Sequence, residues 1–524
     1  MPSTAWAALA TLAACSHALQ LPLQKPLDSH PISAPSIDYT KRPLVDTQEL
    51  QDLIKIKNLY KRAEKLYDIA KSSEEEFNHP TRVIGSKGKL PQSHQLRLNF
   101  TNGVGHAGTL KYIKDTLHSL GDYYDVSTQN FPVTSWHVYE SRLVLGHDVP
   151  ESAQPIGLSP ATPNKQPIFG QVININNYGC EASDYPSDVK GNIAFIKRGG
   201  CAFGSKSEQA LNAGAAAAII YNDKDGEYNG SLQEPIDKHV PTFALSGEEG
   251  KKYLKQLEDG QTLDGIAYID AAIETVNTTN VIAQTRGGDK DNVVMLGGHS
   301  DSVTAGPGIN DDGSGSLSLL EIAVKLTEFK VANSVRFAWW SAEEEGLLGS
   351  VYYADHLSPK ENKKIRLFLD YDMLASPNFA YQIYNSSDAE NPQGSEQLRD
   401  LYIDWYKAHG LNYTFVPFDG RSDYVGFILH GIPSSGVATG AEGIKTEEEE
   451  ALFGGKAGDW YDPAYHQLED DLGNLNLTAW EANTKLVAHS VATYARSLKG
   501  FPAREDVESL GERKLPYRGS TLVM

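Results

Sequence analysis

The chain has 524 residues, of which 40% are hydrophobic and 22% are charged, and its formal net charge is −21 at pH 7. Because this length exceeds what one ordinary hydrophobic core supports, we expect two folded units with terminal segments. The composition is typical of a water-soluble globular protein. The negative charge excludes nucleic acid as a partner, because the protein would repel the phosphates.

The N-terminal residues have a pattern typical of a secretory signal. An apolar run from Ala5 to Cys15 is followed by Ser16-His17-Ala18, a small-x-small cleavage pattern. The run is too short to cross a bilayer, which needs about 20 residues. We therefore predict a signal peptide over residues 1–18, with a disordered apolar start as the alternative. No later stretch approaches transmembrane length, so we expect no membrane span.

Cysteine usage and glycosylation signals agree with export. If Cys15 leaves with the signal, Cys180 and Cys201 remain, and this even pair suits one disulfide, with two free thiols as the alternative. Six N-x-S/T sequons, which predict surface glycosylation in an exported chain, begin at Asn99, Asn229, Asn277, Asn385, Asn412 and Asn476. We predict a secreted, extracellular protein, and delivery to a vacuole by the same signal stays open.

The chain then divides into segments of different texture. Residues 19–45 carry five prolines and little periodicity, which predicts an extended leader. Apolar residues at helical spacing predict one helix over 46–72 and another over 106–120. Short β-like runs, turns and an Ala-rich segment predict a smaller β-rich α+β domain inserted at 135–270. The polar residues 499–524 predict a poorly ordered tail.

From residue 278 onward, strand and helix patterns alternate, which predicts an α/β fold. We expect a mostly parallel central sheet with helices on both faces, formed by residues 46–134 and 271–498 on either side of the insertion. Strands are predicted at 293–296, 335–340, 365–369 and near 433–438. Helices are predicted at 314–329, 346–357, near 396–409 and at 480–498. We interpret the run Glu447–Glu450 as a solvated loop without a role.

Carboxylates and an imidazole follow three of these strands at the point where each strand ends. His299 and Asp301 follow the first strand, Glu343 and Glu344 the second, and Asp372 the third. Ligands of parallel sheets collect outside the carboxyl ends of the strands, so we expect these side chains to converge in one crevice.

Asp311 opens the helix after the first strand and faces the same edge. Several carboxylates in one crevice would repel one another unless a cation held them, and imidazole with carboxylate suits zinc. Two zinc ions that share one carboxylate can bind both an attacking water and a polarised carbonyl. We predict two zinc ions bridged by Asp311, with His299 and Asp372 on one, and Glu344 and His466 on the other.

Two residues of the group remain for catalytic roles. Asp301 is expected to accept a hydrogen bond from the His299 ring and fix its tautomer. Glu343 is left beside the metals, where a general base belongs. Each signal alone is weak, because a His-x-Asp after a strand is usually a surface turn and paired glutamates usually start a solvated helix. Their combination at consecutive strand ends, without HExxH, GxSxG or GxxxxGK[ST], supports the hypothesis.

Four segments of the chain resemble, in order, the metal-site blocks of one enzyme family. They are GGHSDSVTAGPGINDDGSGS, VRFAWWSAEEEGLLGSVYYADHL, LFLDYDMLASPN and YDPAYHQLEDD. From about 46 to 498 the chain is similar to secreted fungal leucine aminopeptidases, relatives of aminopeptidase Y and of bacterial two-zinc aminopeptidases. The resemblance implies a zinc exopeptidase fold, the same five ligands and Glu343 as base.

The resemblance also implies a substrate and further site residues. It implies release of leucine and other bulky apolar residues from peptides with a free N-terminus, by a chain that we expect to be monomeric. Tyr465 would donate to the developing oxyanion and Arg421 would contact substrate; the residues alone indicate a packed aromatic and an ion-pair partner. Glu345 departs from the family, which usually has an apolar residue there. Residues 135–270 resemble a protease-associated domain.

Other functions fit the same fold. A carboxypeptidase would need clustered arginines for a terminal carboxylate, and only Arg421 is a candidate. A glutaminyl cyclase would use one zinc ion. A receptor-like homologue without catalysis would have lost metal ligands, whereas all five are present here.

Overall fold

The structure, a computed structural model, describes residues 39–86, 105–226, 228, 230–232, 236–387 and 391–504. The predicted signal peptide, most of the predicted leader, the sequons at Asn99 and Asn229 and most of the predicted tail lie outside the described residues.

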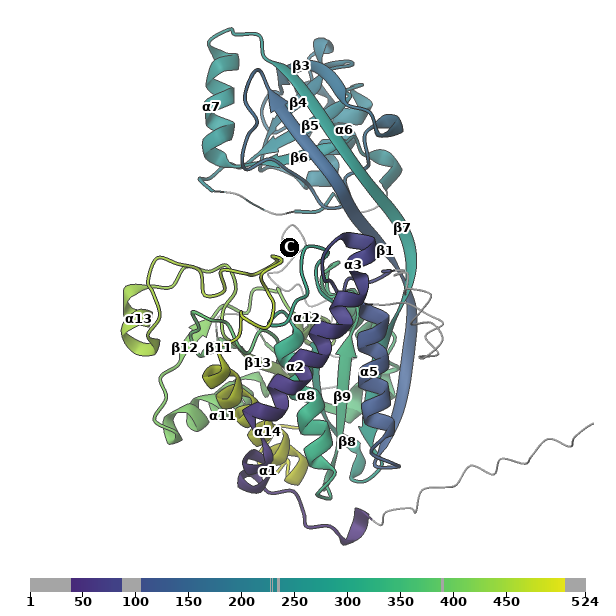
Figure 1. Cartoon of the computed structure of the whole chain (residues 1–524), viewed down its shortest axis with the longest axis vertical. Helices are drawn as coiled ribbons and strands as arrows, with labels where there is room; N and C mark the ends of the chain where they lie inside the picture. The colour runs from purple at the N-terminus through teal and green to yellow at the C-terminus, as the bar shows by residue number, and fades with distance from the viewer. Residues whose placement is uncertain are drawn as a thin grey trace, which may run out of the picture. The chain divides into compact units, whose positions relative to one another are not determined.

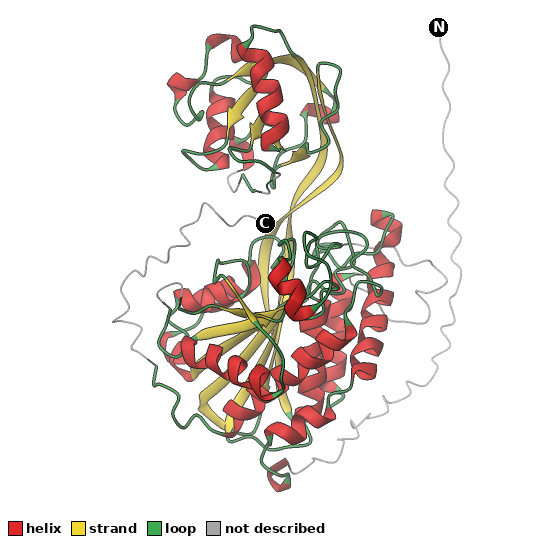
Figure 2. Cartoon of the chain, turned by 90° about the vertical axis from the view of Figure 1, so that its left-hand side faces the viewer, coloured by secondary structure: helices red, strands yellow, loops and turns green. Residues whose placement is uncertain are grey.

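The larger part of the chain is built on a sheet whose central strands are parallel and whose faces are covered by helices (Figure 1; Figure 2). Its strand order is β12-β11-β13-β10-β8-β9-β7. The strands are β7 (Asp264–Thr285), β8 (Asp289–His299), β9 (Asn333–Trp340), β10 (Ile365–Tyr371), β11 (Gln382–Tyr384), β12 (Thr414–Val416) and β13 (Ser434–Ala438). Strands β9, β8, β10 and β13 are mutually parallel, β7 runs antiparallel to β9, and β11 runs antiparallel to β13 but parallel to β12. The predicted α/β class is confirmed.

Helices form where apolar residues recur at helical spacing, and they pack those residues onto the sheet. Helices α8 and α14 are buried along most of their length, because they pack against each other as well as the strands. The helices of this part are α1 (Thr47–Leu53), α2 (Ile56–Ala70), α3 (Glu74–Phe77), α5 (His106–His118), α8 (Gly313–Leu326), α9 (Leu348–Asp355), α10 (Pro359–Lys364), α11 (Ser395–Ala408), α12 (Tyr424–Leu429), α13 (Glu447–Phe453) and α14 (Leu477–Arg496).

The single helix predicted over 46–72 is wrong, because the chain breaks into α1 and α2. Ile54 and Lys55 take extended backbone conformations between the two helices. The break turns Ile54 into the core, where its side chain is fully buried. Periodicity alone does not detect such a break, since the apolar spacing continues through it.

The solvated loop predicted at Glu447–Glu450 is also wrong, because these residues begin helix α13. Thr446 caps the helix, and the carboxylate of Glu449 accepts from the Thr446 backbone N–H in a capping box. Glu449 is buried and also accepts a hydrogen bond from Tyr461 Oη at 2.5 Å. The acidic run therefore stabilises a helix N-terminus.

Both predicted terminal segments contribute to the fold at their inner ends. Val45, the last residue of the predicted leader, is fully buried and its N–H donates to the Lys330 carbonyl. At the other end, the Pro502 carbonyl accepts from the Arg366 guanidinium at 2.8 Å. Residues 505–524 of the predicted tail lie outside the described residues.

Two long strands connect the larger part to the inserted domain. Strand β1 (Tyr124–Leu145) pairs with β7 antiparallel along nearly its whole length, with one bulge between Val138 and Glu140. The predicted boundaries after residues 134 and 270 therefore fall inside continuous strands. Periodicity does not mark where such a strand leaves one core and enters another.

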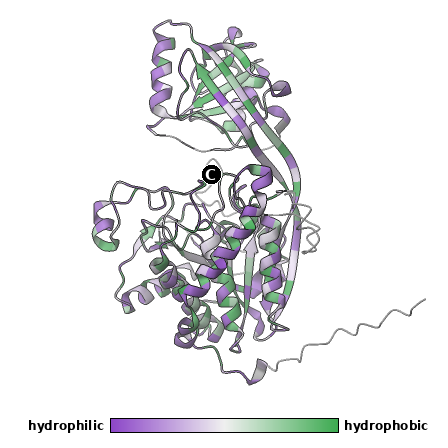
Figure 3. Ribbon diagram, in the orientation of Figure 1, coloured by the Kyte–Doolittle hydropathy of each residue, from purple (hydrophilic) through white to green (hydrophobic). Residues whose placement is uncertain are grey.

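The inserted domain has its own sheet and its own hydrophobic clusters. Its strands β3, β4, β5 and β6 are parallel in that order, and β3 also pairs with β7. Helix α7 is largely hydrophilic, whereas the strands beside it are mainly hydrophobic (Figure 3). The elements are β2 (Gln154–Pro155), β3 (Ile168–Asn174), β4 (Ile193–Lys197), α6 (Phe203–Asn212), β5 (Ala217–Tyr221), β6 (Thr242–Leu245) and α7 (Gly247–Glu258).

Cys180 and Cys201 form a disulfide in this domain, closing a loop with a sequence separation of 21. The loop is also held by Lys206, whose buried ammonium group donates to the Gly199 carbonyl at 2.6 Å. The disulfide expected from the sequence is therefore present.

We predict that Cys201→Ser lowers the free energy of unfolding of the inserted domain by about 3 kcal/mol, because an open loop of this length gains entropy when unfolded. Thermal melts of wild type and variant measure the change. Peptide mapping without reductant should recover Cys180 and Cys201 in one linked fragment. Two separate fragments with free thiols would contradict the pairing.

Candidate metal centre

Three neighbouring parallel strands deliver acidic side chains and an imidazole to one edge of the sheet. His299 is the last residue of β8, and Asp372 comes directly after β10. Glu343 and Glu344 lie in the turn that follows β9. Parallel strands end at the same edge, so the chain topology alone brings these side chains together.

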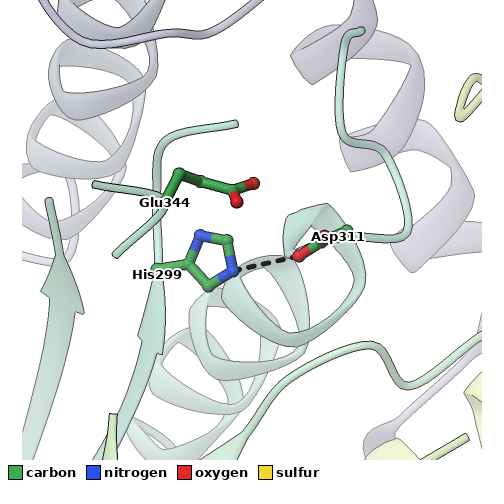
Figure 4. A group of neighbouring side chains, drawn as sticks. All are labelled: His299, Asp311 and Glu344. Atoms are coloured by element: carbon green, nitrogen blue, oxygen red, sulfur yellow. Dashed lines mark hydrogen bonds and ion pairs between the residues drawn. The ribbon is translucent and has the colours of Figure 1, made fainter. Parts of the chain in front are cut away.

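Asp311 lies between two imidazoles, one of which comes from the distant loop that follows helix α13. Its Oδ1 is 3.1 Å from His299 Nε2, and its Oδ2 is 3.2 Å from His466 Nε2. Figure 4 shows the His299–Asp311 contact with Glu344 beside it. The two oxygens of one carboxylate therefore face two different imidazoles.

One further carboxylate lies beside each imidazole. Asp372 Oδ1 is 3.6 Å from His299 Nε2, and Glu344 Oε2 is 3.2 Å from His466 Nε2. Ligand atoms about 2.0–2.1 Å from a tetrahedral ion lie about 3.3 Å from one another. The spacing of these nitrogen and oxygen atoms is therefore that of ligands around small divalent cations.

Two buried atoms of this group have no hydrogen-bond partner in the described part of the chain. They are Asp372 Oδ1 and His299 Nδ1. A buried carboxylate oxygen without a donor is costly unless a cation satisfies it. Imidazole nitrogen with carboxylate oxygen is also a donor set that divalent metals bind. The residues present therefore fit a metal centre.

The electrostatics of the group agree with this fit. Burial lowers the pKa of His466, but the carboxylates of Glu344 and Asp311 outweigh it and raise that pKa to about 10. Burial likewise opposes a raised pKa at His299, which Glu343 and Asp372 hold well above its usual value. Without a metal, protons on these rings would take the place of a cation between the carboxylates.

Glu343 lies within reach of the same atoms. Its Oε2 is 3.8 Å from His299 Nε2, farther than the carboxylate of Asp311. Donor atoms of His299, Glu343 and Asp372 nevertheless lie within 4.8 Å of one another, as do those of His299, Asp311 and Glu344. The shorter contact makes Asp311 the partner of His299. The distances do not decide whether Glu343 is a further metal ligand or a base.

The expected hydrogen bond between Asp301 and the His299 ring is not formed. Asp301 Oδ1 lies 3.7 Å from His299 Nδ1, beyond hydrogen-bond distance. The two carboxylate oxygens of Asp301 instead accept, at 3.5 and 3.4 Å, from the backbone N–H groups of Glu343 and Glu344. Asp301 thus links the turn after β8 to the turn after β9, and its carboxylate still faces the imidazole.

Glu345 is not among the residues that line the cavity, but it does not point into solvent either. One of its carboxylate oxygens is buried without a hydrogen-bond partner in the described structure. Burial raises its pKa well above the usual value, and Asp301 and Glu344 add to the effect. At least one oxygen of this side chain is therefore removed from water in an acidic environment.

A cavity opens above these residues. Its acidic part consists of Asp311, Glu343, Glu344 and Asp372, and its lining also includes apolar and aromatic side chains. The apolar and aromatic lining residues are Leu347, Met373, Tyr384, Val416, Ala438 and Tyr465. A ligand in this cavity would have both carboxylates and apolar side chains within reach.

Known proteins match both parts of the chain. Residues 280–491 match the profile of peptidase family M28, and residues 168–253 match that of the PA domain. Aminopeptidase Y of Saccharomyces cerevisiae is 44% identical over 511 residues, covering 94% of this chain and 90% of its own length. The chain belongs to peptidase family M28. The resemblance to aminopeptidase Y and to fungal leucine aminopeptidases predicted from the sequence is confirmed.

Other M28 relatives agree across most of the chain. Leucine aminopeptidase 2 of Trichophyton rubrum is 41% identical over 468 residues, covering 88% of this chain and 89% of its own length. The solved aminopeptidase from Aneurinibacillus sp. strain AM-1 is 25% identical, with a TM-score of 0.65, and covers 86% of this chain and 96% of its own. A zinc aminopeptidase from Bacillus subtilis, 24% identical with a TM-score of 0.59, shares the fold.

The two substrate residues suggested by the M28 resemblance lie together at the rim. Tyr465 stacks on the His466 ring, with ring centroids 3.8 Å apart. The guanidinium of Arg421 donates to Glu442 at 2.8 Å and lies 3.5 Å from Tyr465 Oη. Both residues line the cavity, so both can contact a molecule bound beside the metal centre.

The sequence reasoning missed a buried arginine of this M28 chain. Arg82 is fully buried, and its guanidinium donates to the carbonyls of Ser300 and Gly308 at 2.5 Å and of Pro307 at 2.7 Å. It thereby shapes the loop between His299 and Asp311. A lone arginine far upstream in sequence carries no signal of this contact.

Two buried carboxylates that the sequence reasoning also missed fix the backbone around Asp311. Asp312 caps helix α8 and accepts from the His299 N–H at 3.1 Å and the Met373 N–H at 3.2 Å. Asp470 accepts from the Asp311 N–H at 3.0 Å. The adjacent pair Asp311-Asp312 was the only hint, because doubled acids at a strand–helix junction often combine a ligand with a cap.

Among the described residues, no helix is long and apolar enough to cross a membrane.

We predict that binding of a divalent cation such as Zn²⁺ to the metal-free protein releases protons. With its pKa raised from 6.5 to about 10, His466 holds a proton at neutral pH that the metal must displace. The apparent affinity should therefore rise with pH between about 6.5 and 10. Calorimetric titration in buffers of different ionisation enthalpy counts the protons, and buffer-independent heats with a pH-independent affinity would contradict the prediction.

Proposed function

We propose that this chain removes N-terminal residues from peptides with two zinc ions held at the centre described above. Membership of peptidase family M28 and similarity to aminopeptidases along almost the whole chain make it a metallo-aminopeptidase. The observation that supports two ions is the orientation of Asp311, whose two carboxylate oxygens face His299 and His466 separately.

The proposed ligands follow from the shortest contacts. Asp311 would bridge the ions, His299 and Asp372 would hold one, and Glu344 and His466 the other. This set suits zinc, and a structural relative is described as a zinc aminopeptidase. When bound, the two ions would lower the pKa of a water molecule and polarise the carbonyl of the scissile peptide bond.

Glu343 is the proposed general base. It would take a proton from the attacking water and return it to the leaving amine. Burial raises the pKa of its carboxyl well above the usual range, and Glu344 adds to this against the opposing influence of His299. A carboxyl with a raised pKa can hold the proton between the two transfers. Asp301 supports Glu343 by accepting its backbone N–H at 3.5 Å.

The cavity accounts for the restriction to N-termini. A free N-terminal ammonium would lie among the carboxylates of its acidic part, which carry the complementary charge. Tyr465 would donate to the oxygen of the scissile carbonyl, and Arg421 would contact substrate beside it. Glu442 pairs with Arg421, so it holds that guanidinium at the rim.

The apolar lining of the cavity supports a preference for leucine and other bulky apolar residues. Leu347, Met373 and Val416 line the cavity together with the residues of the acidic part. Burying a leucine side chain there would contribute about 1.5–3 kcal/mol to substrate binding. Relatives at 41–42% identity are named leucine aminopeptidases.

We also propose that the chain acts as a secreted, glycosylated monomer. The disulfide and the presence of sequons at exposed positions both support export. Asn277 and Asn412 are exposed, whereas Asn385 and Asn476 are half-buried. Vacuolar delivery is the alternative, and finding the protein in the culture medium or in the vacuole separates the two.

The decisive test compares leucyl-p-nitroanilide with its N-acetylated form. We expect rapid hydrolysis of the first only, because acetylation removes the ammonium charge. Exhaustive chelation should abolish activity, and titration with zinc should restore it in full only at two equivalents. Full activity at one equivalent would contradict the two-ion centre. Cleavage of the acetylated substrate, release of C-terminal residues, or cyclisation of an N-terminal glutamine would contradict the aminopeptidase.

The roles of Glu343 as base and Glu344 as ligand can be tested separately. Glu343→Gln cannot accept the proton of the attacking water, so kcat should fall by about 10²–10⁴-fold while zinc content stays near wild type. Glu344→Gln should lose both activity and zinc, because it removes a proposed ligand. Kinetics and elemental analysis of the purified variants measure both.

Glu345→Gln is the matched control for this pair. Glu345 is half-buried and does not line the cavity, so we expect zinc content near wild type and at most a small change in kcat. If Glu343→Gln loses zinc while Glu344→Gln keeps it, the assignment of base and ligand is shifted by one residue.

A further inference from the structure

A buried histidine joins the ends of the two strands that carry the proposed ligand His299 and the proposed base Glu343. His106 begins helix α5, and only 3% of its surface is exposed. Its Nε2 lies 2.9 Å from Ser300 Oγ, at the end of β8, and 3.3 Å from Ser341 Oγ, at the end of β9. Neither contact involves an atom of a proposed metal ligand.

The hydrogen bonds of the two serines determine which partner is the donor. Ser300 Oγ lies 2.6 Å from the Trp340 carbonyl, and Ser341 Oγ lies 2.6 Å from the Thr279 carbonyl. Carbonyls only accept, so each hydroxyl uses its one proton there. His106 Nε2 must therefore carry the proton and donate to both serine oxygens. Burial also lowers the pKa of His106 to about 4, which keeps the ring neutral.

The two serines lie close in sequence to His299 and Glu343, so their positions affect those of the proposed ligand and base. Ser300 lies between His299 and Asp301, and its N–H also donates to the Trp340 carbonyl at 2.8 Å. Ser341 comes two residues before Glu343, and its N–H donates to Asn280 Oδ1 at 3.0 Å. A shift of either serine would move the neighbouring ligand or base.

The backbone before His106 is shaped to bring the ring this close. Gly105 has a φ of +63°, and a Cβ there would lie 2.5 Å from Ser73 Oγ and 2.9 Å from the Thr81 carbonyl. Only glycine fits without displacing these atoms. The start of α5 therefore packs closely against the segment that carries Arg82. Arg82 in turn donates to the Ser300 carbonyl.

We propose that His106 is a positioning residue for the M28 reaction: its single Nε2–H donor fixes the spacing of the β8 and β9 ends and so holds His299 in place relative to Glu343. The proposal rests on the proposed function. A histidine that merely fills the core would act through its volume, whereas this role requires the donor.

Two substitutions separate donor from volume. His106→Leu fills much of the same space without a donor, and His106→Gln places an amide N–H group near the position of Nε2. We expect His106→Leu to lower kcat about 10–100-fold and to weaken zinc binding about 10-fold, with KM changed less than kcat. His106→Gln should recover most of both losses.

Leu117→Ala is the matched control, because Leu117 is fully buried on the same helix and belongs to the hydrophobic core. It should lower the melting temperature while the zinc affinity and kcat of the folded protein stay near wild type. Zinc affinity is measured by competition with a chelator on the full chain, and thermal melts are recorded for every variant.

The proposal is overturned if His106→Leu keeps wild-type kcat and zinc affinity, or if His106→Gln and His106→Leu lose both equally. If His106→Leu fails to fold, Ser341→Ala tests the same contact by removing one acceptor, and an unchanged kcat and zinc affinity there would also overturn it. The zinc measurement needs no turnover. A wild-type protein that hydrolyses no peptide would therefore refute the proposed function, while the comparison of zinc affinities still tests His106.

Discussion

The structure depends on holding several carboxylates together in a place where they repel one another. Asp301, Asp311, Glu343, Glu344 and Asp372 converge on two imidazoles at one edge of the sheet. Taking such charges out of water is costly unless opposite charge and hydrogen-bond donors compensate. Two divalent cations would supply most of that charge. The fold then has to fix each side chain before the cations arrive, since the repulsion would otherwise drive the side chains apart.

Hydrogen bonds to the backbone and one buried guanidinium meet this requirement. Asp312 joins the ends of β8, β10 and α8 by accepting three backbone N–H groups, and Asp470 holds the backbone of Asp311. The buried guanidinium of Arg82 donates to backbone carbonyls of the loop between His299 and Asp311. A positive group at that depth lowers the electrostatic cost of the acidic cluster without competing for its ligand oxygens.

The cavity beside the centre combines charged and apolar lining residues. The acidic part offers charge for a metal and an ammonium group, and the apolar lining residues offer surface for a side chain. Tyr465 and Arg421 also line this cavity, and Arg421 is held by its contact with Glu442. Several of the apolar and aromatic lining residues, such as Met373 beside Asp372 and Tyr465 beside His466, come from the same segments as the proposed ligands, so the segments that carry the ligands also shape the cavity.

The sequence by itself indicated the α/β class, the inserted domain and the acidic residues that lie together in the structure, because alternating apolar patterns and strand-end carboxylates are local signals. Only the tertiary structure brought His466, from a distant loop, beside Glu344. It did not determine the break at Ile54, the helix at Glu447–Glu450 or the limits of the long strands, since continuous periodicity and acidic runs are compatible with either structure. Only the tertiary structure decided that Asp301 accepts from backbone N–H groups, that His106 contacts Ser300 and Ser341, and that Arg82 donates to the Ser300 carbonyl. These contacts join residues up to 235 positions apart, and no local pattern encodes which distant backbone group a buried donor will meet.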